Sequence, residues 1–128
     1  MGTQYLLDSN TIIGFLDNRI PYKGMMLVSE VVNVVPNISV ISKIEVLRYN
    51  TTEFAMRILE DFVNYSNICE LDAQTVNTTI RLCRQSKIKL PDAIIAATCL
   101  VNKYILLTRN EKDFVRITDL NIINPWDL

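Results

Sequence analysis

The sequence predicts an α/β sandwich in which a central, mostly parallel sheet of four or five strands carries helices on both faces. Short apolar segments of strand length alternate along the chain with longer segments of helical periodicity, which is the pattern of a parallel sheet with crossover helices. Acidic residues also stand at or just beyond the predicted strand ends, and parallel strands end at one edge of a sheet. With 128 residues, of which 49% are hydrophobic, the chain fits one folded domain spanning residues 1–128.

Five short apolar segments have the composition of strands and are bounded by polar or turn-forming residues. They cover residues 4–7, 38–41, 67–71, 104–108 and 121–123. The last segment precedes Asn124 and Pro125. Because proline cannot donate to a sheet ladder, we expect this strand to lie at an edge.

Six helices are predicted between the strands from apolar periodicity and from residues that begin or end helices. They cover a segment ending at residue 16 and residues 25–35, 42–49, 53–65, 73–85 and 91–101. Asp8, Ser9 or Asn10 is expected to cap the first helix. A turn over residues 18–24 separates it from the second helix, which Pro36 should end.

The composition excludes several classes of protein. There is no histidine, which removes Ser-His-Asp and Cys-His catalysis and zinc sites built on histidine. No segment approaches the roughly 20 apolar residues of a membrane span, and no secretory signal pattern is present. The cysteines Cys69, Cys83 and Cys99 lack CxxC spacing, as is typical of free thiols in a reducing compartment. We therefore expect a cytoplasmic protein without membrane association.

Four acidic residues occupy positions that the predicted topology brings together: Asp8, Glu45, Asp92 and Asp113. Converging carboxylates repel one another unless a cation lies between them, and the hard ions Mg²⁺ and Mn²⁺ prefer oxygen ligands. Metal-assisted phosphodiester chemistry is therefore the leading hypothesis. Two of the acids have alternative structural roles. Ser42 and Glu45 have the spacing of a capping box, and Asp92 would compensate the dipole of the helix that begins at Pro91.

Three short motifs fall around these acids: LDSNT at residues 7–11, LPDAIIAA at residues 90–97 and LTRNEKDF at residues 107–114. Together they resemble the PIN domain family and, within it, the VapC-type toxins of toxin–antitoxin systems. The resemblance covers nearly the whole chain. It implies a Mg²⁺- or Mn²⁺-dependent endoribonuclease that cleaves structured RNA such as tRNA or rRNA. It also implies inhibition by a cognate antitoxin, and a homodimer.

The resemblance also assigns roles to individual residues by their position in the motifs. The catalytic and metal-binding residues would be Asp8, Glu45, Asp92 and Asp113. The polar residues that support them would be Ser9, Asn10, Thr108 and Asn110. Candidate phosphate contacts near the site are Lys43, Arg48 and Arg109.

Rival interpretations account less well for these residues. Asp8 stands alone after the first strand, unlike the paired acids of a phosphoacceptor domain, and Asn10 breaks the DxDxT motif of a haloacid-dehalogenase-like phosphatase. The remaining alternative is a noncatalytic PIN-like module that binds RNA or a protein. The four acids argue against it, because a binding scaffold need not keep carboxylates that repel. The net charge of −1 argues against a broad nucleic-acid footprint but leaves room for a small basic patch.

Overall fold

The computed structural model describes residues 2–128, and its sheet has the strand order β3-β2-β1-β4-β5 with every pair parallel. The strands are β1 (Tyr5–Leu7), β2 (Asn37–Ser39), β3 (Asn67–Cys69), β4 (Ile105–Leu107) and β5 (Ile122–Ile123). The helices are α1 (Ser9–Leu16), α2 (Tyr22–Val34), α3 (Val40–Leu47), α4 (Glu53–Tyr65), α5 (Ala73–Gln85) and α6 (Leu90–Asn102), with the 3₁₀ turns η1 (Glu111–Asp113) and η2 (Pro125–Asp127). The predicted α/β architecture is confirmed, and β5 is an edge strand as expected.

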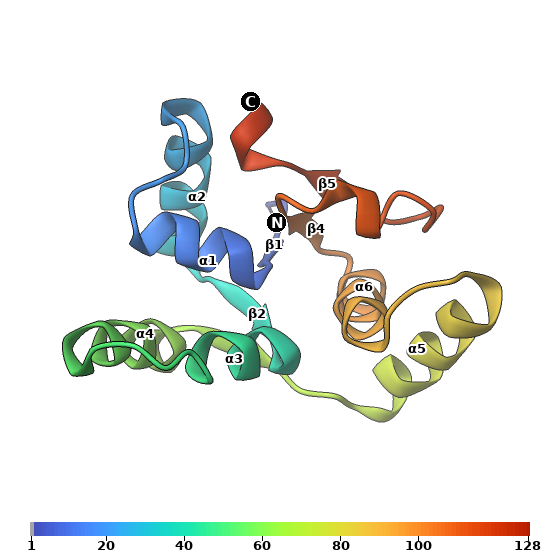
Figure 1. Cartoon of the computed structure of the whole chain (residues 1–128). Coiled ribbons are helices and arrows are strands. Elements are labelled where there is room, and N and C mark those ends of the chain that lie inside the picture. The colour runs from blue at the N-terminus through green and yellow to red at the C-terminus, as the bar shows by residue number, and fades with distance from the viewer. Residues whose placement is uncertain (1) are drawn as a thin grey trace.

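Two cores lie on opposite faces of the sheet because side chains alternate along each strand. Leu6 and Leu106 pack into one core with residues of α5 and α6. Leu7 and Leu107 pack into the other with residues of α1, α2, α3 and α4. Figure 1 shows these two groups of helices on either side of the strands. The central strands are therefore buried on both faces, which explains their continuous apolar sequence.

The predicted bounds of α4 and α5 are confirmed, while two predictions near other helix starts are wrong. Residue 24 was expected in a turn, but α2 already begins at Tyr22, after Pro21. Ser42 was expected to cap α3, but β2 ends at Ser39, two residues earlier than expected. Ser39 caps the helix instead, and its hydroxyl accepts from the Ser42 backbone N–H at 3.0 Å. Ser42 is buried inside the helix, so it does not form a capping box with Glu45.

Two glycines allow the C-terminal turn η2 to pack closely against the N-terminal helices. A Cβ atom on Gly24 would lie 1.8 Å from the backbone oxygen of Pro125. A Cβ atom on Gly14 would lie 2.7 Å from the Trp126 ring. A larger residue at position 24 would require η2 to move, and one at position 14 would require the Trp126 ring to shift, so these contacts restrain the position of Trp126.

The remaining sequence-based expectations concern thiols and membranes. Cys69, Cys83 and Cys99 are free, as predicted. Within residues 2–128, every helix is too short or too polar to cross a bilayer.

Candidate active site

The four predicted acids all lie at the carboxyl edge of the sheet. Asp8 directly follows β1 and is the N-cap of α1. Glu45 lies on α3, which continues from the end of β2, and Asp92 lies in the first turn of α6. Asp113 ends η1, which follows β4. Strand ends and helix starts therefore bring together residues separated by up to about a hundred positions, as the parallel topology predicts.

Asp8 is held in place by three hydrogen bonds and is only 5% exposed. Its Oδ1 accepts from the Ser9 backbone N–H at 2.8 Å. Its Oδ2 accepts from the Thr108 hydroxyl at 2.8 Å and from the Asn10 amide at 3.3 Å. An ionised carboxylate has about four acceptor positions, so one remains for a ligand. The protein thus orients the Asp8 carboxylate and leaves one of its acceptor positions free.

The pKa of Asp8 reflects a balance of opposing effects. Burial is the largest and raises the pKa above its ordinary value of 3.8. Hydrogen bonds from Thr108 and Ser9 favour the charged form and offset part of the rise. The Glu45 carboxylate raises the pKa further, because two like charges disfavour each other. The site therefore favours a neighbouring cation.

A small polar network fixes Thr108 in its turn. The Thr108 hydroxyl oxygen accepts from the Asn10 amide at 3.2 Å and from the Asn110 backbone N–H at 3.1 Å. The Asn10 side-chain oxygen accepts from the backbone N–H of Arg109 at 3.0 Å. Asn10 and Thr108 thus donate to Asp8 directly, while Asn110 contacts only Thr108 and does so through its backbone.

Ser9 connects the Asp8 loop to α3. Its hydroxyl donates to Oε1 of Glu45 at 3.1 Å, and its backbone N–H donates to Asp8. Ser9 therefore contacts two of the four acids. Asp8 caps the helix that follows β1, and Glu45 lies on the helix that follows the neighbouring strand β2. Sequence reasoning placed Ser9 among the supporting residues, and the structure places it between Asp8 and Glu45.

Asp92 experiences the combined charge of the other three acids. The pKa of Asp92 is raised to about 6, and burial is the largest cause. The carboxylates of Asp113, Asp8 and Glu45 add to this rise in that order. The nearby Lys89 ammonium offsets part of it. The four acids therefore share one electrostatic environment, even though Asp113 itself is exposed.

The donor set suits a hydrated divalent ion better than a metal enclosed by protein. Among residues 2–128, no three His, Cys, Asp or Glu side chains are arranged so that they could hold an ion directly. Mg²⁺ keeps several of its waters and commonly binds through one or two carboxylates. Asp8 has an unused acceptor position, and Asp92 carries a raised pKa that a cation would lower. Oxygen ligands of this kind fit Mg²⁺ or Mn²⁺.

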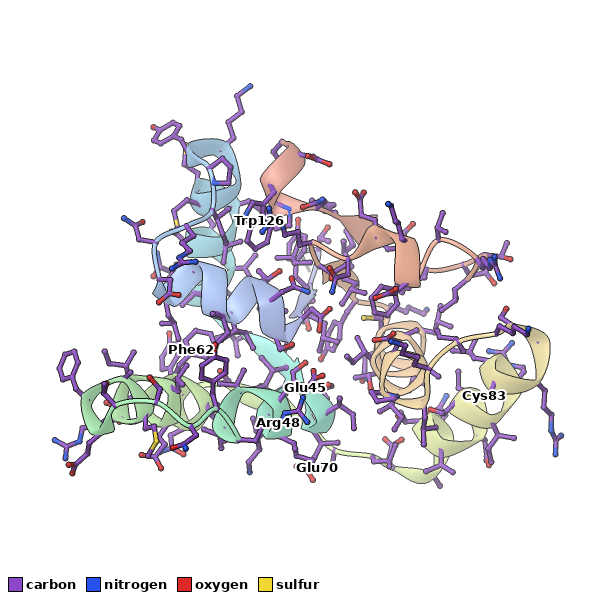
Figure 2. All side chains as sticks on the ribbon, viewed as in Figure 1. Glu45, Arg48, Phe62, Glu70, Cys83 and Trp126 are labelled. Atoms are coloured by element: carbon purple, nitrogen blue, oxygen red, sulfur yellow. The ribbon has the colours of Figure 1, made fainter. Side chains whose placement is uncertain are left out.

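A cleft of about 630 Å³ opens on one side of the acids. Its lining includes one of the four acids, Glu45, and the two residues that follow Asp8 in the sequence, Ser9 and Asn10. Farther along, its lining includes Arg19, Arg48, Tyr49, Arg109, Asn110 and Trp126. Figure 2 shows Glu45 and Arg48 close together on α3. Of the three predicted phosphate contacts, Arg48 and Arg109 line this cleft and Lys43 does not.

A second hollow of about 270 Å³ opens beside the other two acids, Asp92 and Asp113. Its cationic lining residues are Lys87, Lys89, Lys112 and Arg116. Sequence reasoning did not single out these four residues. The available signal was the KIK segment at residues 87–89, directly before the LPDAIIAA motif.

Comparisons with known proteins agree with this fold. The PIN domain family model matches residues 5–120. A toxin–antitoxin complex from Klebsiella pneumoniae contains a chain of 26% identity and TM-score 0.76, with 98% of this chain and 100% of that chain covered. VapBC-1 from nontypeable Haemophilus influenzae gives 26% identity and TM-score 0.78 over 96% and 98% of the two chains. DNA-bound VapBC from Salmonella typhimurium shares the fold at 20% identity and TM-score 0.79, over 97% and 99%. No curated protein matches the sequence.

Proposed function

Because the chain belongs to the PIN domain family, we propose that it is a VapC-type toxin, a metal-dependent endoribonuclease that cleaves structured RNA such as tRNA or rRNA. The observation that carries this proposal is the convergence of Asp8, Glu45, Asp92 and Asp113 on one edge of the sheet. Burial first, and then the other three carboxylates, raise the pKa of Asp92 to about 6, and a cation bound among the acids would relieve this repulsion. We place the enzyme in the cytoplasm.

The role of the protein in the reaction would be to bind the metal ion and to orient the carboxylates that hold it. Asp8 and Asp92 would be the principal ligands of Mg²⁺ or Mn²⁺, with Glu45 and Asp113 reaching the ion directly or through water. The bound ion would supply a water of lowered pKa and neutralise charge on the phosphoryl oxygens. Ser9, Asn10 and Thr108 keep the Asp8 carboxylate in one orientation, so that no reorganisation is needed when charge develops.

The reaction is a hydrolysis. A water oxygen bonds to phosphorus, the bond from phosphorus to the 3′ oxygen breaks, and the water's proton leaves to solvent or a carboxylate. The 3′ oxygen takes up a proton, which leaves a 5′ phosphate and a 3′ hydroxyl. Attack by the ribose 2′ hydroxyl usually relies on a general base and acid, often histidine, and the chain has none.

The test is RNA cleavage by the purified chain with Mg²⁺ or Mn²⁺ and with excess EDTA. Asp8→Asn and Asp92→Asn should each lower the rate by roughly 10²-fold or more, since a lost metal ligand costs several kcal/mol of transition-state stabilisation. Asp61→Asn, an exposed acid on α4, is the matched control and should leave the rate unchanged. Full activity in EDTA would contradict the mechanism. RNA binding without cleavage at any metal concentration would instead favour the noncatalytic alternative.

We also propose that a cognate antitoxin inhibits the enzyme and that two copies of the chain form a homodimer. The support is that the Klebsiella structure is a toxin–antitoxin complex and the Haemophilus structure is VapBC-1. The chain also exposes large apolar side chains on α2 and α4, including Tyr22, Val34, Phe54 and Tyr65. Co-expression with the product of an adjacent small reading frame, followed by affinity capture and a cleavage assay, tests the first point. Sedimentation of the isolated chain tests the second.

A further inference from the structure

The two hollows beside the acidic site differ in chemistry, and each borders a different part of the acidic quartet. Glu45 borders the larger cleft, while Asp92 and Asp113 border the smaller one. Asp8 connects the two hollows. It accepts a hydrogen bond from Asn10 of the larger cleft, and its charge raises the pKa of Asp92 in the smaller hollow. A polymer that lies in both hollows must therefore pass over the acids.

The cations of this acidic protein are concentrated along that path. Three arginines line the larger cleft and four cations line the smaller one, so the two hollows together hold seven of the 13 Lys and Arg residues. Within residues 2–128, the ion pairs join Arg19 to Asp17 and Arg57 to Glu53. The four cations of the smaller hollow, and Arg48 and Arg109 of the larger one, thus have no carboxylate partner within that part of the chain. They are available to phosphate groups.

Of these two hollows, the larger cleft is lined by aromatic side chains and the smaller one is not. The guanidinium of Arg109 lies 5.0 Å from the centre of the Trp126 ring, and Tyr49 also lines the cleft. The position of this pair is fixed at both ends. Trp126 packs against Gly14, and the Arg109 backbone N–H donates to Asn10, which in turn donates to Asp8. A planar cation stacked on an indole, held at a fixed offset from the acids, is a surface on which an unpaired base can stack.

We propose that one unpaired RNA strand occupies both hollows, with the scissile phosphate over the acids. One base stacks on the Arg109–Trp126 pair in the larger cleft, and the smaller hollow binds only backbone phosphates. The inference rests on the proposed nuclease function and adds two subsites for the strand, one that stacks a base and one that binds backbone phosphates. Base preference then arises on one side of the cleaved bond and charge recognition on the other.

The decisive experiment uses short single-stranded RNAs with one modification at a time on either side of the cleavage site. An abasic nucleotide at one position should lower cleavage by the parent protein about 5- to 100-fold, as expected for the loss of one base stack. The same substitution should have little effect on Trp126→Ala and a nearly full effect on Trp126→Phe, which retains a ring. Neutral methylphosphonates on the opposite side of the cleaved bond should weaken cleavage by the parent but not by Lys87→Gln/Lys112→Gln.

A binding measurement separates this inference from the proposed function. In EDTA, where no cleavage is expected, fluorescence anisotropy should show the same pattern of abasic and methylphosphonate effects. Lys87→Gln/Lys112→Gln should reduce the slope of log affinity against log salt by about 1.4, since each phosphate contact on single strands contributes about 0.7. Trp126→Ala should weaken binding with the slope unchanged, and Lys23→Gln on α2 should change neither.

The outcomes are distinct. If cleavage is absent but the binding pattern holds, the nuclease proposal fails and the two-hollow path stands. If cleavage occurs, three results would each show that the two-hollow path is wrong while the nuclease proposal stands. Abasic nucleotides have no effect, their effect is undiminished in Trp126→Ala, or their effect falls on the same side of the cleaved bond as the methylphosphonate effect.

Discussion

The hydroxyl of Thr108 donates to Oδ2 of Asp8 at 2.8 Å, although the two residues are 100 positions apart. The direction of this bond is determined by its surroundings. The Thr108 oxygen already accepts from the Asn10 amide and the Asn110 backbone N–H, so its own proton must point at Asp8. The contact joins the ends of the two central strands, and it makes the orientation of a buried carboxylate depend on one hydroxyl group.

Thr108→Val should destabilise the protein and weaken the site, because it removes this donor while keeping the shape of the side chain. The backbone N–H of Asn110 and the amide of Asn10 lose an acceptor, and the pKa of Asp8 should rise further. We expect a loss of about 1–3 kcal/mol in urea unfolding and a lower metal affinity near neutral pH by titration calorimetry. Thr108→Ser keeps the hydroxyl and is the control. Equal stability of Thr108→Val and parent would show that the bond contributes nothing.

Asp8 and Asp92 should respond differently to substitution by asparagine in the metal-free protein. Repulsion alone predicts that Asp8→Asn and Asp92→Asn both stabilise it. At Asp8, however, an amide nitrogen in the place of Oδ2 would face the Asn10 amide and the Thr108 hydroxyl, which are both donors. We therefore expect Asp92→Asn to melt higher than the parent and Asp8→Asn to show no such gain. A clear stabilisation by Asp8→Asn would mean that repulsion outweighs these hydrogen bonds.

The metal-free protein should lose stability as the pH rises through the titration of Asp92. The folded-state pKa of about 6 exceeds the ordinary value of 3.8, so the folded protein binds more protons between these values. The free energy of unfolding should then fall from about pH 4 to pH 6 and level off above pH 7. After allowance for solvent screening of this half-exposed group, the fall is about 1 kcal/mol.

The pH effect has an internal control and a metal response. Asp92→Asn should remove that fall, as measured by urea unfolding across the pH range in EDTA. Mg²⁺ at pH 7 should raise the melting temperature of the parent, since it binds the folded state. An unchanged pH profile in Asp92→Asn would assign the titration to another group.

The two glycines under η2 should differ in their effect on stability and function. Gly24→Ala sets a methyl group against the Pro125 backbone and should destabilise the protein by about 3 kcal/mol or more. Gly14→Ala meets only side-chain atoms, the edge of the Trp126 ring at 2.7 Å and Ile20 at 3.2 Å, and these can shift. We expect a smaller loss in thermal unfolding, with altered Trp126 fluorescence and weaker RNA binding. Equal effects of the two substitutions would show that η2 adjusts freely at both contacts.

Periodicity and end signals predicted the fold well where a helix is amphipathic and capped locally. The starts of α4 and α5 coincide with Thr52 and Asp72, whose side chains accept from backbone N–H groups of the first helical turn. The start of α3 did not follow, because Ser39 and Ser42 are both good caps. The three-residue length of β2 decides between them, and sequence does not specify that length.

The acids could be located from sequence because each follows a strand or begins a helix, and strand ends are visible in the apolar pattern. The residues that line the two clefts could not be grouped from the sequence. Arg19, Tyr49, Arg109 and Trp126 come from four separate segments, and their convergence depends on how η2 packs on Gly14. The smaller hollow likewise joins the approach to α6 with the turn at η1. Such groupings depend on three-dimensional packing rather than on local signals.

The sheet order also has a consequence for synthesis of the protein. The central strand β1 is the first to leave the ribosome, yet its partner β4 and the Thr108 donor are encoded a hundred residues later. At roughly 5–20 residues per second, β1 waits about 5 to 20 s for its neighbour. Asp113 follows β4 in the sequence, so the four acids cannot converge until the segment after β4 has also been synthesised. The cluster of four acids therefore forms only after the segments that carry Asp92 and Asp113 have left the ribosome.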